Sequence, residues 1–222
     1  MDFYRECDGL TFQADGHRYE LDGKRVMSLT QILDAAGLVD YSAVNPQVLA
    51  DKAKFGTKIH EYCLWLSKGD LDMDDLKPYP KYWNRVEGWR QFIEDFKFKF
   101  DLDWCEVPCA VKVNGILYAM TIDCYGSYGE GENISLAVVE IKTCADQEPS
   151  HAIQTAGQAI AFHSHAETLQ MPLKRFAVYL QDKPDAGGRY YKVQEHTEGS
   201  TRRYFCRPSS SPNGASITSC SD

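Results

Sequence analysis

The sequence lacks three features that would place it in a specialised class of protein. No apolar run approaches the roughly 20 residues that a membrane-spanning helix needs. Residues 1–8 contain no basic stretch followed by an apolar one, so we expect no signal peptide and a cytoplasmic location. Basic residues are too few for broad nucleic-acid affinity, because 24 lysines and arginines face 32 aspartates and glutamates, a net charge of −8. A local basic groove around an acidic metal site remains compatible with that charge.

The eight cysteines lack the spacing of a metal-binding cluster. No pair is spaced Cys-x-x-Cys. Cys105 and Cys109 lie four residues apart, on one face of an expected strand and too far along it for a zinc knuckle. We therefore expect free and mostly buried thiols in a reducing compartment.

The rest of the composition is ordinary for a globular protein, with 43% hydrophobic and 25% charged residues. The 222 residues suffice for one domain with a large core, which we expect over 1–206. Residues 207–222 are rich in serine, proline, glycine and asparagine, so we expect a disordered tail there.

Local signals predict an alternation of helices and strands, and hence an α/β fold. A capping box at Ser28, Asn45 followed by a proline, and Ser150 mark three helix starts. The dipeptides at 22–23 and 114–115, Asp-Gly and Asn-Gly, mark two hairpin turns. The predicted helices cover 28–36, 45–68, 82–99 and a segment from 150, the predicted strands cover 17–21, 24–27, 105–113, 116–124, 136–143, 175–181 and 190–194, and 126–133 is predicted to be a loop.

The most informative segment is 136–143, Leu-Ala-Val-Val-Glu-Ile-Lys-Thr, whose short and continuous apolar run predicts a buried strand. Side chains alternate along a strand, so Glu140 and Lys142 share one face and Ile141 takes the other. Charges at the end of a buried strand are costly unless they are paired, bound to a metal or used in chemistry. Taken alone, the Glu-x-Lys pattern is best explained as an ion pair that ends a strand.

A second candidate lies on the predicted helix 45–68, where Gly56 and His60 share one face. Glycine lowers helix stability, so we expect something to approach the backbone closely beside His60. Taken alone, His60 is better explained as an ordinary histidine at a helix boundary.

Acidic residues on three successive predicted strands favour a functional interpretation of these candidates. Glu106 lies near the start of the first strand, Asp123 at the end of the second and Glu140 near the end of the third. We expect the strands to bring the three carboxylates into one sheet, although convergence depends on a register that the sequence leaves open.

Carboxylate oxygens are the ligands that Mg²⁺ and Mn²⁺ prefer. Two carboxylates and His60, with the backbone carbonyl of Ile141, could hold such an ion and leave positions for water and a phosphate. The ion would lower the pKa of the water and neutralise charge on the phosphate. Lys142 could orient or deprotonate that water, or stabilise the phosphate charge.

Four motifs occur in order along the chain: Gly-Thr-Lys-Ile-His at 56–60, Thr-Ile-Asp at 121–123, Val-Glu-Ile-Lys-Thr at 139–143 and Gln-Thr-Ala-Gly-Gln at 154–158. With them the chain resembles the PD-(D/E)XK nuclease superfamily, specifically the RecB-like exonuclease branch often found in phages. The segment 28–33 also looks like the opening of phage members, and the resemblance covers roughly 17–195.

The resemblance implies a restriction-endonuclease-like αβββαβ core, with a mixed central sheet flanked by helices, and metal-dependent hydrolysis of DNA. By it, His60, Asp123, Glu140 and the Ile141 carbonyl would hold Mg²⁺ or Mn²⁺. Lys142, with Glu140 and Asp123, would be catalytic. Gln154 would contact the lysine, the water or the DNA, and Glu106 matches an acidic position of some members.

Substrate and partners follow from the same resemblance. A net-acidic nuclease needs a local basic track, for which the candidates are Lys52, Lys54, Lys58, Arg85 and Arg90, although such charges are usually a solvated face. Other expected partners are a single-strand annealing or recombination protein and further copies of the chain. A phage-encoded protein would act in the bacterial host cytoplasm.

The chain departs from the family pattern in two places. The family's helix motif ends in tyrosine, where this chain has Gln158, which we nevertheless place among the DNA contacts. Cys206 and Cys220 do not form the C-terminal cysteine cluster of iron–sulfur relatives, so we expect no such cluster.

Two alternatives to a nuclease stay open. A catalytically inactive relative could bind nucleic acid or a partner protein as a scaffold, or the chain could be a plain α/β protein with a structural Glu140–Lys142 pair.

Overall fold

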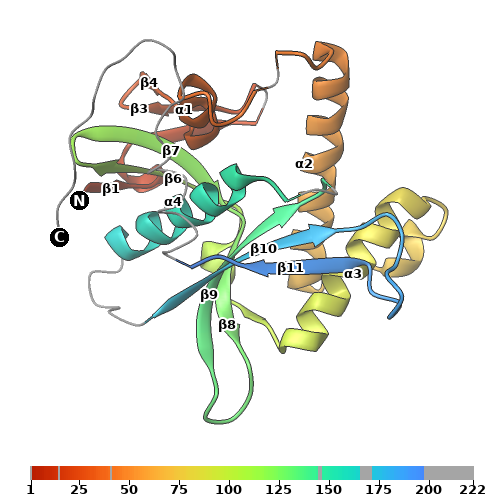
Figure 1. The fold of residues 1–222 in the computed structure, drawn as a ribbon. Coiled ribbons are helices and arrows are strands. Elements are labelled where there is room, and N and C mark those ends of the chain that lie inside the picture. The colour runs from red at the N-terminus through yellow and green to blue at the C-terminus, as the bar shows by residue number, and fades with distance from the viewer. Residues whose placement is uncertain (1, 15, 41, 145–146, 166–171, 198–222) are drawn as a thin grey trace, which may run out of the picture.

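The computed structural model describes residues 2–14, 16–40, 42–144, 147–165 and 172–197, so the predicted tail lies outside the described residues. These residues form a mixed α/β fold in which helices flank a central sheet (Figure 1). The α-helices are α1 (Leu29–Ala35), α2 (Pro46–Lys68), α3 (Pro80–Phe96) and α4 (Pro149–His165). The strands are β1 (Asp2–Tyr4), β2 (Leu10–Gln13), β3 (Arg18–Leu21), β4 (Lys24–Val26), β5 (Lys99–Phe100), β6 (Val107–Val113), β7 (Ile116–Ile122), β8 (Cys124–Tyr128), β9 (Ser135–Lys142), β10 (Leu173–Leu180) and β11 (Tyr191–Glu195).

The central sheet has the strand order β11-β10-β9-β8-β5. It is mixed, as predicted, because β9 and β10 are parallel while the other neighbours are antiparallel. The parallel pair is connected through α4, since a parallel connection needs a crossover that returns the chain to the same end of the sheet. β9 is the middle strand, and five of its eight residues are buried, as its apolar run predicted.

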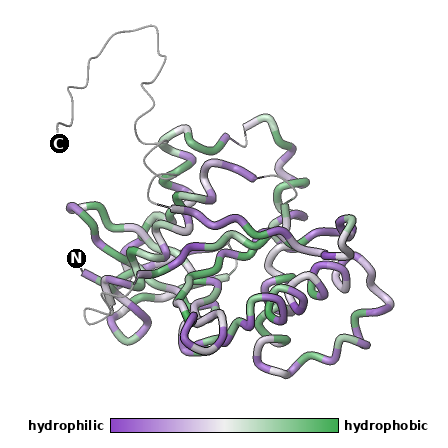
Figure 2. The backbone as a smooth tube through the Cα atoms, turned by 60° about the horizontal axis from the view of Figure 1, so that its bottom comes forward, coloured by the Kyte–Doolittle hydropathy of each residue, from purple (hydrophilic) through white to green (hydrophobic). Residues whose placement is uncertain are grey.

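Two layers of helices cover the two faces of the central sheet (Figure 1). On one face, α2 and α3 pack onto β8–β10 through an aromatic core that contains the stacked rings of Trp89 and Phe92. On the other face, α4 packs onto β8 and β9, and Phe162 stacks on Tyr125 with ring centroids 3.9 Å apart. Figure 2 shows hydrophobic and hydrophilic segments interspersed along the described chain.

Two smaller sheets, β1-β6-β7 and β2-β3-β4, lie on the other side of α4 from the tip of the β8–β9 hairpin (Figure 1). The β2-β3-β4 sheet packs against β6 and β7 through a small core of its own. The buried members of that core are Leu10, Tyr19, Val26, Ala110 and Ala119. The opposite face of the β6–β7 hairpin contributes to the core under α4.

The acidic residues lie differently from the prediction. Glu106 precedes β6, because its φ of 54° is in the left-handed region and the strand predicted from 105 begins only after it. Asp123 lies between β7 and β8, where the chain leaves the β1-β6-β7 sheet and enters the central sheet. The prediction that Glu106, Asp123 and Glu140 share one sheet is therefore wrong, and the three carboxylates occupy the junction of two sheets.

Other boundaries also shift. α3 ends at Phe96, because Lys97 adopts a left-handed conformation and Lys99–Phe100 pairs with β8. The predicted loop at 126–133 is shorter, since Cys124–Tyr128 is a strand. Ser150 lies inside the first turn of α4, which begins at Pro149.

Two of the three predicted capping signals, at Ser28 and Asn45, were confirmed. The Ser28 hydroxyl accepts a hydrogen bond from the Gln31 N–H, and the Gln31 side chain accepts one from the Ser28 N–H. The Asn45 side chain caps α2, with Pro46 in its first turn. None of the helices in the described residues combines the length and apolar character needed to cross a membrane.

The three glycines of the described helices differ in what surrounds them. A Cβ on Gly88 of α3 would lie 2.3 Å from the backbone carbonyl oxygen of Tyr190, so close packing requires glycine there. A Cβ on Gly157 of α4 would meet only the ends of two flexible side chains, Leu29 at 2.5 Å and Met120 at 2.9 Å, which can move aside. A Cβ on Gly56 would meet only Thr143 Oγ1, at an ordinary 3.7 Å. The close approach that we expected at Gly56 is thus not made by the described residues.

Candidate metal centre

His60, Glu106 and Asp123, called the trio below, come together at the junction of the two sheets. His60 Nδ1 lies 3.0 Å from Glu106 Oε1 and 3.7 Å from Asp123 Oδ1. Their possible ligand atoms all lie within 4.8 Å of one another. The backbone N–H of Glu106 donates to the carbonyl of Asp123 at 2.9 Å, which fixes the two acidic residues relative to each other.

The backbone of Glu106 is strained in a way that suits a functional position. A non-glycine residue with positive φ costs on the order of 1–3 kcal/mol, and such residues gather at active and binding sites. The left-handed conformation ends the turn after the 3₁₀ helix Leu102–Trp104 and places the Glu106 side chain beside α2. Of the two acids in the trio, Glu106 lies nearer to His60, at 3.0 Å against 3.7 Å for Asp123.

Glu140 and Lys142 lie beside the trio at the end of β9. Lys142 Nζ donates to Glu140 Oε1 at 2.6 Å and to Gln154 Oε1 at 2.6 Å. The peptide N–H of Ile141 donates to Asp123 Oδ2 at 2.7 Å. This bond joins the end of β9 to the trio, so Asp123 and Glu140 face one compartment.

Helix α4 contributes two glutamines to this compartment. Gln154 accepts from Lys142 and donates from Nε2 to Thr30 Oγ1 at 3.3 Å, which ties the site to α1. Gln158 is 2% exposed and donates from Nε2 to Glu140 Oε2. The two residues are one turn apart, so one helix face holds both Lys142 and Glu140 in place.

Burial and the mutual repulsion of the carboxylates together set the electrostatics of the site. Burial raises the pKa of Asp123 well above its usual value, and the charge of Glu140 raises it further. Burial by itself lowers the pKa of His60, but Asp123, Glu106 and Glu140 outweigh it and raise that pKa to about 10. His60 therefore holds a proton between two carboxylates, where a cation is favoured.

The donor set fits a hard divalent cation. Carboxylate oxygens and an imidazole nitrogen converge within one ion's reach. A histidine binds a metal only as the neutral imidazole, so the ion would replace the proton that His60 holds between the carboxylates. The trio overlaps the predicted ligands at His60 and Asp123 and adds Glu106. Glu140 is engaged by Lys142 and Gln158, and Ile141 contacts Asp123 through its N–H.

Lys142 is a cation in this environment. Burial lowers its pKa, but the carboxylate of Glu140, which accepts its hydrogen bond, outweighs burial and raises it. A lysine with a raised pKa keeps its proton near neutral pH. Lys142 is therefore equipped to donate hydrogen bonds to an anion rather than to act as a base.

The predicted basic residues are spread over α2 and α3. Lys52 and Lys54 are exposed, whereas Lys58 pairs with an acidic neighbour and lies over two aromatic rings of α2. Arg85 pairs with an acid in the β10–β11 loop. Arg90 is bonded to both Glu87 and Glu94, so its charge is already balanced.

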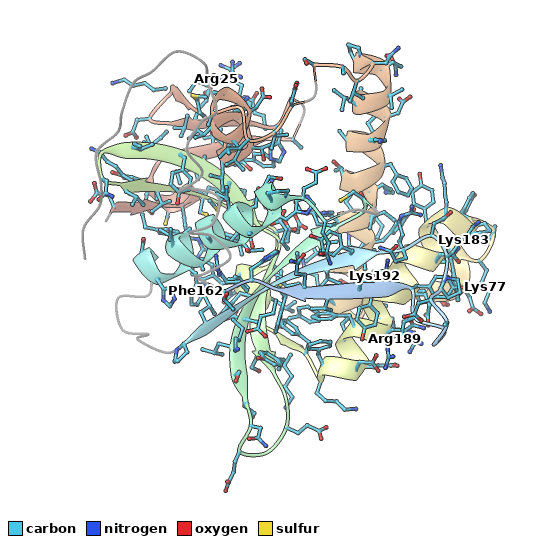
Figure 3. All side chains as sticks on the ribbon, in the orientation of Figure 1. Arg25, Lys77, Phe162, Lys183, Arg189 and Lys192 are labelled. Atoms are coloured by element: carbon cyan, nitrogen blue, oxygen red, sulfur yellow. The ribbon has the colours of Figure 1, made fainter. Side chains whose placement is uncertain are left out.

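Further basic residues lie outside that set. Figure 3 shows Lys77, Lys183, Arg189 and Lys192 on the α3 side of the molecule, away from Arg25 in the β2-β3-β4 sheet. Arg189 pairs with Asp95, so this group too is partly neutralised.

Two side chains have roles that the sequence did not indicate. Gln158 was placed among the DNA contacts, but its burial corrects that prediction, because a side chain bonded to Glu140 beneath α4 has no surface to offer DNA. Thr30 was missed as the partner of Gln154. The two residues are 124 positions apart, and no local sequence pattern predicts such a contact.

Comparison with known proteins adds no assignment. No protein-family model matches the chain, and no curated protein has a significantly similar sequence. The functional argument therefore rests on the site.

Proposed function

We propose that this protein is a divalent-metal-dependent deoxyribonuclease, an exonuclease of the phage recombination or repair type. One juxtaposition carries the proposal: the trio lies beside the Glu140–Lys142 pair at the end of the central strand. A group that can hold a divalent cation next to a lysine that stays charged provides what phosphodiester hydrolysis requires.

The order of elements supports a restriction-endonuclease-like core. A helix that carries His60 precedes the hairpin that ends at Asp123, and β9 with Glu140 and Lys142 follows. The crossover helix α4 then brings Gln154 over the end of β9, and β10 pairs parallel to β9. With α3, β5 and β8 added, this order is compatible with the αβββαβ core that the resemblance implies.

Each residue then has a role. His60, Glu106 and Asp123 would hold Mg²⁺ or Mn²⁺, with Glu140 alongside. When bound, the ion would neutralise phosphate charge and make a nearby water more acidic. The Lys142 ammonium, aimed by Glu140 and Gln154, would donate to an oxygen of the reacting phosphate.

The direct test is digestion of linear DNA with Mg²⁺, with EDTA, and in two variants. Glu140→Gln removes a charge from the site, and Glu87→Gln removes a buried charge from α3, where Arg90 is its partner. We expect EDTA and Glu140→Gln to abolish digestion and Glu87→Gln to leave it intact. DNA binding without digestion by the wild type would instead support the inactive scaffold.

We further propose that DNA runs along the exposed side of α2. Lys52 and Lys54 are free to contact phosphates, and Lys58 lies 4.9 Å from the ring centroids of both Tyr62 and Trp65. Aromatic rings beside lysines suit stacked bases and their phosphates.

Salt dependence tests this track. Lys52→Gln with Lys54→Gln should lower the slope of log K against log salt by about one for each lost phosphate contact. Lys112→Gln, an exposed lysine on β6, is the control. An unchanged slope in the double variant would remove α2 from the DNA path.

A further inference from the structure

A chain of hydrogen bonds links the β2-β3-β4 sheet to the metal centre. Tyr19 of β3 is 1% exposed, and its hydroxyl lies 2.8 Å from Thr121 Oγ1 and 3.1 Å from His17 Nε2. Thr121 lies two residues before Asp123 on β7. The phenol therefore holds His17 at the end of the sheet that adjoins the trio.

The imidazole of His17 is fixed on several sides. Its ring packs edge-on against Phe12 and Tyr19, with centroids 5.1 and 5.3 Å away. The bond from Tyr19 to Thr121, two residues before Asp123, sets it on the side of this sheet towards the trio. Burial lowers the pKa of His17, and the charges of Glu106 and His60 also act on that pKa. The second ring nitrogen, Nδ1, has no hydrogen-bond partner among the described residues, although it belongs to an exposed residue at the rim of the site.

The turn itself does not require a histidine. His17 has a φ of 48°, and Gly16 before it a φ of 73°, so two consecutive residues of the β2–β3 turn are left-handed. Glycine and asparagine adopt this conformation most readily. The turn therefore does not explain why a histidine is present at position 17, with Nε2 bonded to Tyr19 and Nδ1 available for another contact.

We infer that His17 is a substrate-contacting residue of the proposed nuclease site, whose Nδ1–H donates a hydrogen bond to a phosphate oxygen of the bound DNA. This inference rests on the proposed function. When Tyr19 donates to Nε2, the proton of the neutral imidazole is on Nδ1, and Thr121 can donate to Tyr19 in turn.

The β2-β3-β4 sheet would then have a function, because it carries a second phosphate donor to the site. Lys142 reaches the site from β9 and is held by α4, whereas His17 reaches it from a separate sheet packed on β6 and β7. Two donors on independent elements would fix the phosphate from two directions, and a fixed orientation of the reacting group is worth more than the same contacts on a mobile loop.

Two variants of His17 separate contact from structure. Glycine and asparagine both fit the positive φ, but only asparagine keeps a donor near the position of Nδ1. The measurements are the single-turnover rate of DNA cleavage with Mg²⁺, the dissociation constant for Mn²⁺ and the unfolding midpoint, each for wild type, His17→Gly, His17→Asn and His163→Ala. His163 is an exposed histidine of α4 and serves as the control.

We expect His17→Gly to lower the cleavage rate about 100-fold, the effect of losing one transition-state donor, and His17→Asn to recover most of it. Mn²⁺ affinity and the unfolding midpoint should stay near wild type in both variants, and His163→Ala should be unchanged throughout. Cleavage by His17→Gly at the wild-type rate, or a loss that matches a loss of Mn²⁺ affinity, would overturn the role of His17 and leave the nuclease standing. Absence of cleavage by the wild type would overturn both.

Discussion

Over its last four residues, 139–142, strand β9 has one apolar face and one charged face. Val139 and Ile141 point into the aromatic core formed with α2 and α3. Glu140 and Lys142, which alternate with them, point into the compartment of α4 and the trio. One strand thus carries an apolar face and a charged face over the same four residues.

The apolar face contributes mainly to stability, whereas the charged face contributes little to it. Each large apolar side chain buried on the α2–α3 face contributes about 1.5–3 kcal/mol. A buried ion pair such as Glu140–Lys142 contributes little net stability, because desolvation offsets the attraction. The carboxylates of the site repel one another, and the Glu140–Lys142 pair adds little to stability. A function in metal binding explains why these groups are gathered there.

The largest expected effect is on the charged face. Lys142→Ala should lower DNA cleavage by about 10⁴-fold, equivalent to about 5 kcal/mol, since it removes the donor to the phosphate. The Mn²⁺ affinity should be retained, because Lys142 is not in the trio. Loss of Mn²⁺ binding in this variant would contradict the role assigned to the lysine.

On the apolar face, Trp89→Ala should lower the unfolding free energy by about 3–5 kcal/mol, because it empties the centre of the aromatic core. Urea denaturation measures the loss. Cleavage per folded molecule should survive at a temperature where the variant is folded. A loss below about 1 kcal/mol would show that this core collapses around the cavity.

Two helix glycines, Gly88 of α3 and Gly56 of α2, extend the comparison to smaller effects. Gly88→Ala should destabilise the protein by about 1–3 kcal/mol, because the added methyl group would lie 2.3 Å from the backbone carbonyl oxygen of Tyr190. Gly56→Ala should stabilise α2 by about 0.5–1 kcal/mol, because only Thr143 is near. Thermal unfolding distinguishes the two signs, and equal signs would refute the packing difference between the helices.

The smallest effect concerns two buried histidines, His151 in α4 and His196 after β11. Burial, with the charge of Arg175, lowers the pKa of His196 to about 4, and burial, with Lys142, lowers that of His151 to about 3. Their folded-state pKa values lie below the unfolded value of 6.5, so their stabilising contribution is present above pH 6.5 and is lost as pH falls towards 4.

His196→Leu tests this dependence. Neither ring nitrogen of His196 has a hydrogen-bond partner among the described residues, so leucine should raise the unfolding free energy by about 1 kcal/mol at pH 7. The variant should also lose less stability than wild type between pH 6.5 and 4.5. Parallel pH profiles for the two proteins would contradict the assigned pKa.

Local signals sufficed for much of the fold and failed at the site. The apolar run of β9, the Asn45 cap and the Asp22-Gly23 turn act through neighbouring residues, so each was predicted correctly. The left-handed backbone of Glu106 and the bend at Asp123 depend on how two sheets meet, which no segment specifies alone.

The same reason explains the side chains that were misplaced or missed. Gln158 was assigned by its position in a motif, whereas its bond to Glu140 depends on the depth at which α4 packs. The link from His17 through Tyr19 to Thr121 was not predicted, because Tyr19 and Thr121 are 102 residues apart in the sequence. Residue types indicated a candidate metal centre, and tertiary packing decides which carboxylates meet there.

Calorimetric titration with Mn²⁺ tests the central claim most directly, using wild type, Asp123→Asn and the control Glu87→Gln. The account predicts one bound ion in wild type and in Glu87→Gln, and an affinity lower by at least about 100-fold in Asp123→Asn, since loss of a ligand should exceed the effect of losing an outer-shell partner. Equal Mn²⁺ binding by Asp123→Asn and wild type would contradict it.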